Sequence, residues 1–358
     1  MLRKKIVHVI VLFFICVLIK IFSCFPAAVE KYYFGIIYPF FSKFFRILFG
    51  WIPFSIGDVF YIAVGVWILY LVVKFFRNVF KKKIFFRKKV LPFFLRWLQI
   101  IFLVYIIFNL FWGLNYNRKG IAWQLKLKPG AYSTQQLDTI VNILLQKSNA
   151  TRMALGKEIK FPDTKTLIEK AKNTYSNTHQ NFSFINYSNQ SIKASLFGTV
   201  GNYIGYSGYY NPFTGEAQLN TTIPKFELPY VVCHEMAHQI GYATEDEANF
   251  VGYLTARSAN DSLFLYSVYI EMFRYANREL FFRDSTLAKA KYMQLDTLVK
   301  QDLIFARKFY RKYDTVFGDM VTQLYSRYLK ANSQPQGINT YTLVTAWLIA
   351  YYKKYGEI

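Results

Sequence analysis

HEMAHQIGYATEDEAN, His234 to Asn249, is the stretch from which both fold and chemistry can be inferred. Pro229 suits the first turn of a helix, and the register continues to Gly241, a typical helix stop. Residues four positions apart share one helix face, so His234 and His238 can direct their imidazoles at one metal ion. Glu235 is offset by about 100° and can reach a water beside that ion. Such an H-E-x-x-H turn supplies two zinc ligands and a general base.

A catalytic zinc site needs a third protein ligand, and three acidic residues follow the histidines. Thr244 and Glu247 form a capping box for a second helix, which gives Glu247 a structural role. Glu245 has no such role, so we expect a turn at 241–243 to bring it to the histidines, with Glu247 as the alternative ligand. Asn249, one turn further along the same face, is expected to support the ligand by hydrogen bonding.

The composition narrows the class of protein. The chain has 358 residues, is 53% hydrophobic and 20% aromatic, and carries a formal net charge of +23. High apolarity with strong basicity is typical of nucleic-acid binders or of membrane proteins with basic flanks. Apolar runs near 6–22, 54–73 and 91–112 favour a membrane-embedded protein, because a spanning helix needs about 20 apolar residues. We therefore expect no nucleic-acid partner.

The basic residues predict an orientation. RNVFKKKIFFRKK, residues 77–89, holds seven basic residues between the second and third runs. Short loops of this kind stay in the cytoplasm, so the third span ends outside and everything after it is extracytoplasmic. We expect a multi-pass protein of the cell (inner) membrane whose first run is an uncleaved anchor. A cleaved signal peptide or lipidation at Cys24 are the alternatives, and both leave the later domain outside.

The chain is thus expected to divide into a membrane region, 1–113, and an extracytoplasmic domain, 114–358. Ser133 with Gln136 forms a capping box, and Asp163 opens another helix. SIKASLF, 191–197, and GEAQLN, 215–220, alternate as strands do, and the chain after Leu228 is helical. These patterns predict an α+β, mostly helical fold in which a small sheet precedes a helical bundle. The apolar stretch 341–352 is too short to span and is expected to pack as a helix.

Two motifs carry a resemblance to known families. HEMAH followed by EDEAN resembles the zincin metallopeptidases with a glutamate third ligand, whose E-x-x-A-[ND] helix maps onto Glu245 to Asn249. The chain also resembles an uncharacterised bacterial membrane family, domain of unknown function 3810, through its three spans, FWGLNYNR at 111–118, and HEMAHQIGYATEDEANF. The resemblance implies a zincin-like fold with zinc as cofactor, and no established substrate. Most such zincins have a longer insert than residues 239–244, which leaves both Glu245 and Glu247 open as third ligand.

These features predict a membrane-anchored zinc metallopeptidase that hydrolyses peptide or protein substrates outside the cytoplasm. Glu235 is expected to take the proton of the attacking water and to deliver it to the leaving amine. The resemblance implies an edge strand that pairs with an extended substrate, and GEAQLN is the candidate. The oxyanion-stabilising side chain is expected among Tyr206, Tyr209, Tyr210 and His179.

Two further functions stay open at this point. One is a catalytically inactive zincin-fold binding or scaffold protein of the cell envelope, against which the intact Glu235 argues. The other is a zinc-dependent amidase that acts on a non-protein substrate. Cys233 is expected to be a core residue because it lies off the ligand face. No C-x-x-C pair occurs, which excludes zinc sites of the paired-cysteine kind. No sequence pattern indicates an oligomeric state.

Overall fold

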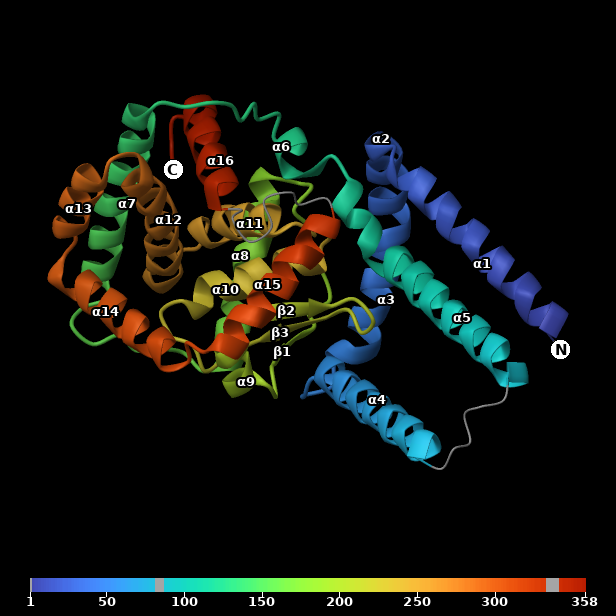
Figure 1. Cartoon of the computed structure of the whole chain (residues 1–358). Coiled ribbons are helices and arrows are strands. Elements are labelled where there is room, and N and C mark those ends of the chain that lie inside the picture. The colour runs from blue at the N-terminus through green and yellow to red at the C-terminus, as the bar shows by residue number, and fades with distance from the viewer. Residues whose placement is uncertain (1, 81–86, 333–340) are drawn as a thin grey trace.

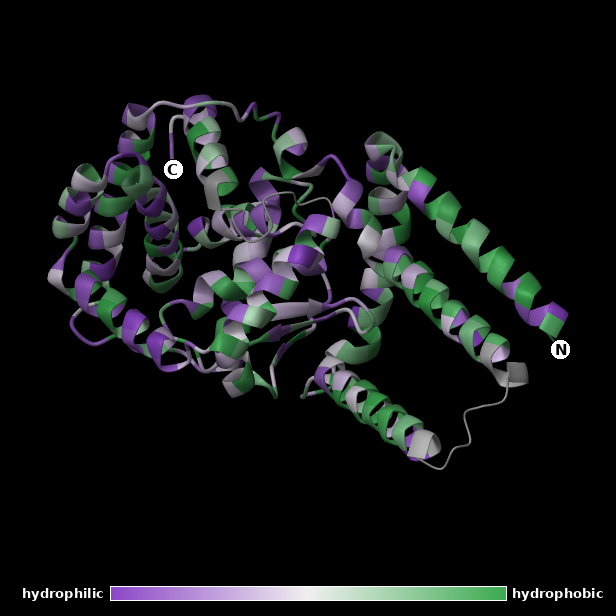
Figure 2. Cartoon of the chain, viewed as in Figure 1, coloured by the Kyte–Doolittle hydropathy of each residue, from purple (hydrophilic) through white to green (hydrophobic). Residues whose placement is uncertain are grey.

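The three apolar runs form long helices. The structure, a computed structural model, describes residues 2–80, 87–332 and 341–358. Helices α1 (Leu2–Ser23), α4 (Ile56–Phe80) and α5 (Arg87–Phe111) each contain a stretch long and apolar enough to cross a membrane. They extend from one side of the molecule and are the most uniformly hydrophobic elements (Figures 1 and 2). The three candidate spans predicted from the sequence are confirmed as helices of sufficient length and apolarity. Within the basic stretch 77–89, residues 81–86 lie outside the described residues.

A helical segment that the sequence analysis did not predict joins the first two spans. It consists of α2 (Pro26–Ala28), the π-helix η1 (Val29–Ile37) and α3 (Tyr38–Gly50). These elements follow one another almost without a break and run across the ends of α1 and α5 that face the domain (Figure 1). The segment therefore lies between the spans and the rest of the chain.

The sheet is small and has three strands, β1 (Ile192–Ala194), β2 (Gly208–Asn211) and β3 (Glu216–Leu219). Their order is β1-β3-β2, with β3 parallel to β1 and antiparallel to β2. The expectation that GEAQLN forms an edge strand is therefore wrong, because β3 has a hydrogen-bonded neighbour on each side. β2 lies at an edge instead. Its glycine and tyrosines gave no clear alternation in the sequence.

The rest of the domain is helical, which confirms the mostly helical α+β class. Its remaining elements in chain order are η2 (Gly113–Asn117), α6 (Gly120–Gln124), α7 (Thr134–Ala154), α8 (Thr164–Asn181), α9 (Gly198–Ile204), α10 (Leu228–Gln239), α11 (Glu245–Arg257), α12 (Ser262–Arg283), α13 (Ser285–Met293), α14 (Thr297–Lys312), α15 (Val316–Ala331) and α16 (Tyr341–Tyr355). The predicted capping box at Ser133 and the predicted cap at Asp163 are both present. Caps of this kind satisfy backbone N–H groups that the first helical turn leaves unpaired.

Helices α10 and α11 lie at the centre of the main core. Most of their side chains are buried, and they pack on the sheet, on α8 and on α12. α16 packs against α11 and α12, as expected for the C-terminal apolar stretch. Two helices buried on most of their surface are held rigidly by the surrounding core, which suits them to position functional side chains.

The second span is fixed to the sheet by polar contacts. The carboxylate of Glu216 on β3 accepts hydrogen bonds from the backbone N–H groups of Ile56 (3.2 Å) and Gly57 (2.5 Å) at the start of α4. Asp58 on α4 accepts from the backbone N–H of Leu196 at 2.6 Å and from the hydroxyl of Tyr209 on β2. A carboxylate at a helix N-terminus is favourable because it meets unpaired N–H groups and the positive end of the helix dipole. The span and the sheet are therefore joined as one unit.

Candidate metal centre

The two histidines of the H-E-x-x-H motif meet on one face of α10. Pro229 lies in the first turn of this helix, as expected. The imidazole rings of His234 and His238 have centroids 4.7 Å apart with an interplanar angle of 87°. Both side chains are almost fully buried, with 12% and 9% exposed. One helical turn therefore presents two imidazole nitrogens to a shared space.

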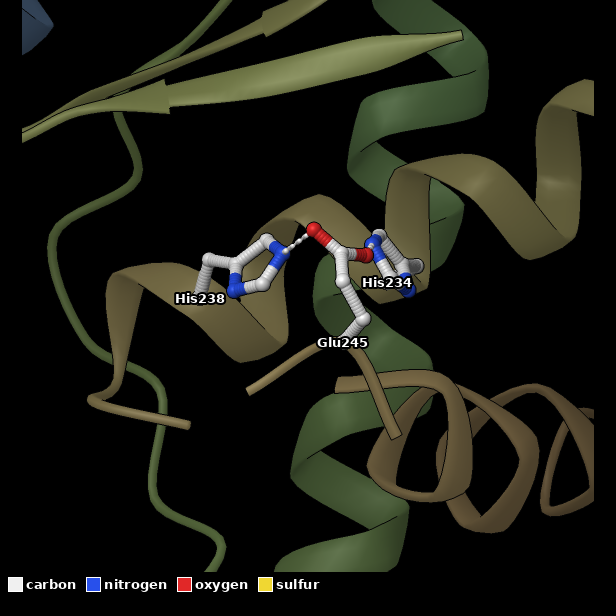
Figure 3. Close-up of side chains that lie close together, drawn as sticks. All are labelled: His234, His238 and Glu245. Carbon is white, nitrogen blue, oxygen red and sulfur yellow. Dashed lines mark ion pairs between the residues drawn. The ribbon is translucent and has the colours of Figure 1, made fainter. Parts of the chain in front are cut away.

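A tight turn brings Glu245 to the same space. Gly241 has φ +96°, a left-handed conformation that glycine adopts without steric cost, and it ends α10 as predicted. Thr244 caps α11 by accepting from the backbone N–H of Glu247 at 3.4 Å. Glu245 is the first residue of α11, and its carboxylate points between the two imidazoles (Figure 3). Its oxygens lie 3.4 Å from Nε2 of His234 and 4.0 Å from Nε2 of His238.

The geometry of these three side chains fits a zinc ion. Candidate ligand atoms of His234, His238 and Glu245 all lie within 4.8 Å of one another. Zinc binds histidine nitrogen and carboxylate oxygen at about 2.0–2.2 Å in a tetrahedral arrangement, which places ligand atoms roughly 3.3 Å apart. The distances of 3.4 and 4.0 Å are close to that value. Two imidazoles and one carboxylate are also a donor set that zinc enzymes use, with a fourth position open.

Hydrogen bonds orient the proposed ligands. Nδ1 of His238 lies 2.7 Å from the backbone carbonyl of Tyr242, to which it can donate a hydrogen bond, leaving Nε2 free to bind a metal. The hydroxyl of Tyr325 on α15 donates to Oε1 of Glu245 at 2.5 Å. Asn249 accepts from the hydroxyl of Tyr230 at 2.9 Å and interacts with His234. Asn249 thus contacts His234, whereas the sequence predicted that it would support Glu245.

The alternative ligand, Glu247, points elsewhere. Its Oε1 accepts a hydrogen bond from the backbone N–H of Ile121 at 2.8 Å, and burial raises the pKa of this carboxyl to about 7, opposed by the charge of Arg118. It is not in the group formed by His234, His238 and Glu245. The expected capping box is half present, because Thr244 caps the helix while the Glu247 side chain turns to α6.

The electrostatics of His238 and Glu245 match the protonation states that metal binding requires, whereas those of His234 favour its protonated form. Burial and the charge of His234 lower the pKa of His238 to about 4. Burial opposes ionisation of Glu245, but the hydrogen bond from His234 and the charges of both imidazoles lower its pKa to about 2. Burial also lowers the pKa of His234, but Glu245 and Glu235 outweigh it and raise that pKa overall. A neutral imidazole and an ionised carboxylate are the forms that bind metals.

Glu235 lies beside the cluster and faces β2. Its side chain is buried, and burial raises its pKa to about 8, with the charge of His234 opposing. A Cβ atom at Gly208 would overlap with the Glu235 carboxylate, so the strand approaches this closely only because residue 208 is glycine. Oε2 of Glu235 has no hydrogen-bond partner among the described residues. A buried carboxylate with one unused oxygen is a group that can accept a proton from a bound molecule.

A cavity of about 1000 Å³ contains the cluster and Glu235. Its walls come from β2, from α15, and from the ends of two spans, where Tyr61, Phe108 and Trp112 contribute. Tyr206, Tyr209 and Tyr210, three of the candidates for the oxyanion-stabilising side chain, line this cavity. His179 lies exposed on α8 and is not part of the lining.

Several site residues were not found from the sequence. Tyr325 lies far along the chain on an amphipathic helix, and no pattern connects it to Glu245. Trp112 belongs to the FWGLNYNR motif, and its ring centroid lies 6.0 Å from that of His238. In the sequence this motif carried only the resemblance to a family, and nothing in it indicated a position beside the histidines. Cys233 is fully buried and its thiol pKa is raised by burial, in agreement with its expected place in the core.

The last residue of FWGLNYNR explains why this motif lies near the cluster. The guanidinium of Arg118 forms an ion pair with Glu30 at 3.1 Å and donates to the carbonyl of Gly241 at 3.0 Å. It also lies over the rings of Phe34 (3.3 Å) and Tyr242 (4.7 Å). Arg118 thus ties the turn between α10 and α11 to the segment that follows the first span.

Comparison with known proteins gives one match. A family model described as a protein of unknown function (DUF3810) matches residues 33–349. No curated protein matches the chain, and no solved structure does either. The matched range includes the second and third spans, the sheet and all residues of the cluster.

Proposed function

We propose that this chain, which belongs to the DUF3810 family of proteins of unknown function, is a membrane-anchored zinc metallopeptidase. The observation that carries the proposal is the convergence of His234, His238 and Glu245 in a cavity that also holds Glu235. The donor set, the distances and the adjacent buried carboxylate together support the proposal of a zincin-like hydrolase.

The proposed chemistry assigns a role to each side chain. His234, His238 and Glu245 would hold a zinc ion, which as a Lewis acid lowers the pKa of water to about 7 and polarises a carbonyl. Glu235 accepts the proton of the attacking water and delivers it to the leaving amine. The cavity wall formed by β2 places an edge strand beside Glu235, and an extended peptide can add to such an edge through backbone hydrogen bonds.

The proposed location is outside the cytoplasm. The C-terminal end of α1, the N-terminal end of α4 and the C-terminal end of α5 all face the domain (Figure 1). The basic start of α1 and Arg77 in the last turn of α4 therefore lie at the opposite end of the spans. Since basic flanks favour the cytoplasmic side, we assign the domain to the extracytoplasmic side of the cell (inner) membrane.

Hydrolysis by the purified full chain tests this function. We expect the protein to cleave unfolded proteins or cell-wall peptides, a chelator to abolish cleavage, and Glu235→Gln to retain zinc while cleavage falls at least about a hundredfold. Cleavage at the normal rate by Glu235→Gln would exclude Glu235 as the base. Binding of these probes without cleavage favours the non-catalytic scaffold, and cleavage of non-protein amides alone favours the amidase.

A further inference from the structure

The segment between the first two spans has one face that holds the metal-binding helix. The hydroxyl of Tyr38 and the hydroxyl of Ser42 on α3 each donate to the carbonyl of Gln239 at 2.9 Å. Both side chains are buried, as are Tyr33 on η1 and Arg46 on α3. Gln239 is the last residue of α10, so this face of the segment satisfies a carbonyl at the C-terminal end of the helix that carries the histidines.

The opposite face of the same segment is apolar and exposed. Side chains spaced about one helical turn apart form an apolar strip: Ile36 (63% exposed), Phe40 (67%), Phe44 (51%), Ile47 (54%) and, just after α3, Trp51 (79%). Isolated exposed apolar residues are common on soluble proteins, but a continuous row of large ones marks an interaction surface. The strip therefore needs a partner that covers it.

Chain connectivity places the strip level with the outer ends of the spans. α1 ends at Ser23, just before the segment, and α4 begins at Ile56, just after it. Where the segment touches α5, it does so at that helix's last turn: Tyr33 donates to the carbonyl of Leu110 at 3.1 Å, and the rings of Phe41 and Phe111 lie 5.1 Å apart. The segment thus crosses the ends of the spans that face the domain (Figure 1), which is where a spanning helix would leave the hydrocarbon.

The charges on the segment complement a lipid surface. Glu30 is the only acidic residue between 26 and 55, and it is buried in its ion pair with Arg118. The exposed charges are Lys31 and Lys43, both basic. Helices that lie in a membrane interface combine a large apolar face with basic residues, and aromatic residues such as Trp51 gather at that level.

We propose that the apolar strip lies in the lipid–water interface of the bilayer and seats the domain on the membrane. The proposal rests on the proposed spans but not on zinc binding or hydrolysis. The segment would then separate α10 from the lipid surface by the width of one helix, about 10–12 Å. The cavity, whose wall includes Tyr61, Phe108 and Trp112 from the span ends, then lies close to the headgroups.

Electron paramagnetic resonance of the full chain in liposomes tests this placement. Single cysteines at Phe40 and Phe44, in a Cys16→Ser and Cys24→Ser background, would carry a nitroxide label. Val66 on α4 (62% exposed) serves as the membrane control, and Met293 at the end of α13 (68% exposed) as the aqueous control. Power saturation compares accessibility to oxygen, which enriches in lipid, with accessibility to a water-soluble nickel chelate.

The expected result is high oxygen and low nickel accessibility at positions 40 and 44, at a shallower depth than position 66. Nickel accessibility at positions 40 and 44 equal to that at position 293 would overturn the proposal, because the strip would then face water. Low accessibility to both reagents would also overturn it, since another protein surface would cover the strip. A water-accessible label at position 66 would show that α4 does not span the membrane, and the interfacial placement of the strip would then be excluded as well. None of these outcomes depends on zinc content, which is measured separately.

Discussion

The hydroxyl of Tyr325 on α15 donates a 2.5 Å hydrogen bond to Oε1 of Glu245, the first residue of α11. Two residues that are far apart in the sequence are thus joined through the carboxylate of Glu245. Groups that hold a metal ligand in place commonly change metal affinity when they are removed. The contact therefore links α15 to the proposed zinc site.

Tyr325→Phe removes only this hydroxyl. We expect zinc affinity of the full chain to fall about tenfold or more, measured by competition with a fluorescent chelator. Tyr328→Phe is the control: Tyr328 also lines the cavity, but its hydroxyl lies 3.3 Å from that of Tyr116 rather than on a proposed ligand. Equal affinities for the two variants would show that the Tyr325 contact does not position Glu245.

Much of the site could be predicted from the sequence, because its parts are local. The i, i+4 histidines lie on one short helix, and Gly241 with Thr244 specifies where that helix ends and the next begins. Glu245 follows the cap directly. A turn this short permits few paths, and the path taken brings Glu245 to the histidines.

The features that were missed depend on contacts between distant segments. The Glu247 side chain turns away from the histidines because it accepts a hydrogen bond from the backbone N–H of Ile121, a residue far from it in the sequence. The edge position of β2 depends on how three short strands pair, and short strands carry little register information. The segment 26–50 is broadly apolar in sequence, and its contact with α10, such as the hydrogen bond from Ser42 to Gln239, joins residues that are far apart in the chain.

Gly208→Ala tests the contact between β2 and the proposed base. The added methyl group would overlap with the Glu235 carboxylate and displace it. We expect kcat/KM for peptide hydrolysis to fall about a hundredfold while zinc content stays unchanged, because a small misplacement of a catalytic group costs this much. Gly130→Ala, where no atom lies within 4 Å of the added methyl group, should behave as the parent protein. Full activity in Gly208→Ala would show that the contact with β2 does not position Glu235 for catalysis.

Arg118→Met tests the link between the turn and the first inter-span segment. It leaves Glu30 as an unpaired buried carboxylate, and we expect the free energy of unfolding to fall by about 3–5 kcal/mol. Arg283→Met breaks an i, i+4 pair with Glu279 in which the arginine is 32% exposed, and it is expected to cost below about 1 kcal/mol. Thermal unfolding in detergent measures the Tm of both variants and of the parent protein. Similar shifts in Tm would argue against a structural role for the Arg118 ion pair.

Stability is expected to depend on pH through Glu227, which lines the cavity away from the cluster. Burial raises its pKa from 4.5 to about 7, although Arg274 opposes this. A carboxyl whose pKa is raised by folding stabilises the fold fully below about pH 4.5, and this contribution is lost as pH rises through about 7. The loss amounts to at most about 3 kcal/mol.

Glu227→Gln removes this titration and should flatten the dependence of Tm on pH between 5 and 8. The measurement compares Tm of the parent and the variant at both pH values. Identical slopes would show that Glu227 does not change its protonation on unfolding in this range.

The zinc content of the purified full chain tests whether His234, His238 and Glu245 hold a metal ion. After dialysis against a competing chelator, elemental analysis is expected to find one zinc per chain in the parent protein and in Glu247→Gln, whose amide can still accept from Ile121. His238→Ala and Glu245→Gln are expected to lose the metal, because each removes one of the three proposed ligands. Absence of stoichiometric zinc from the parent protein, or its retention in His238→Ala and Glu245→Gln, would show that these side chains are not zinc ligands.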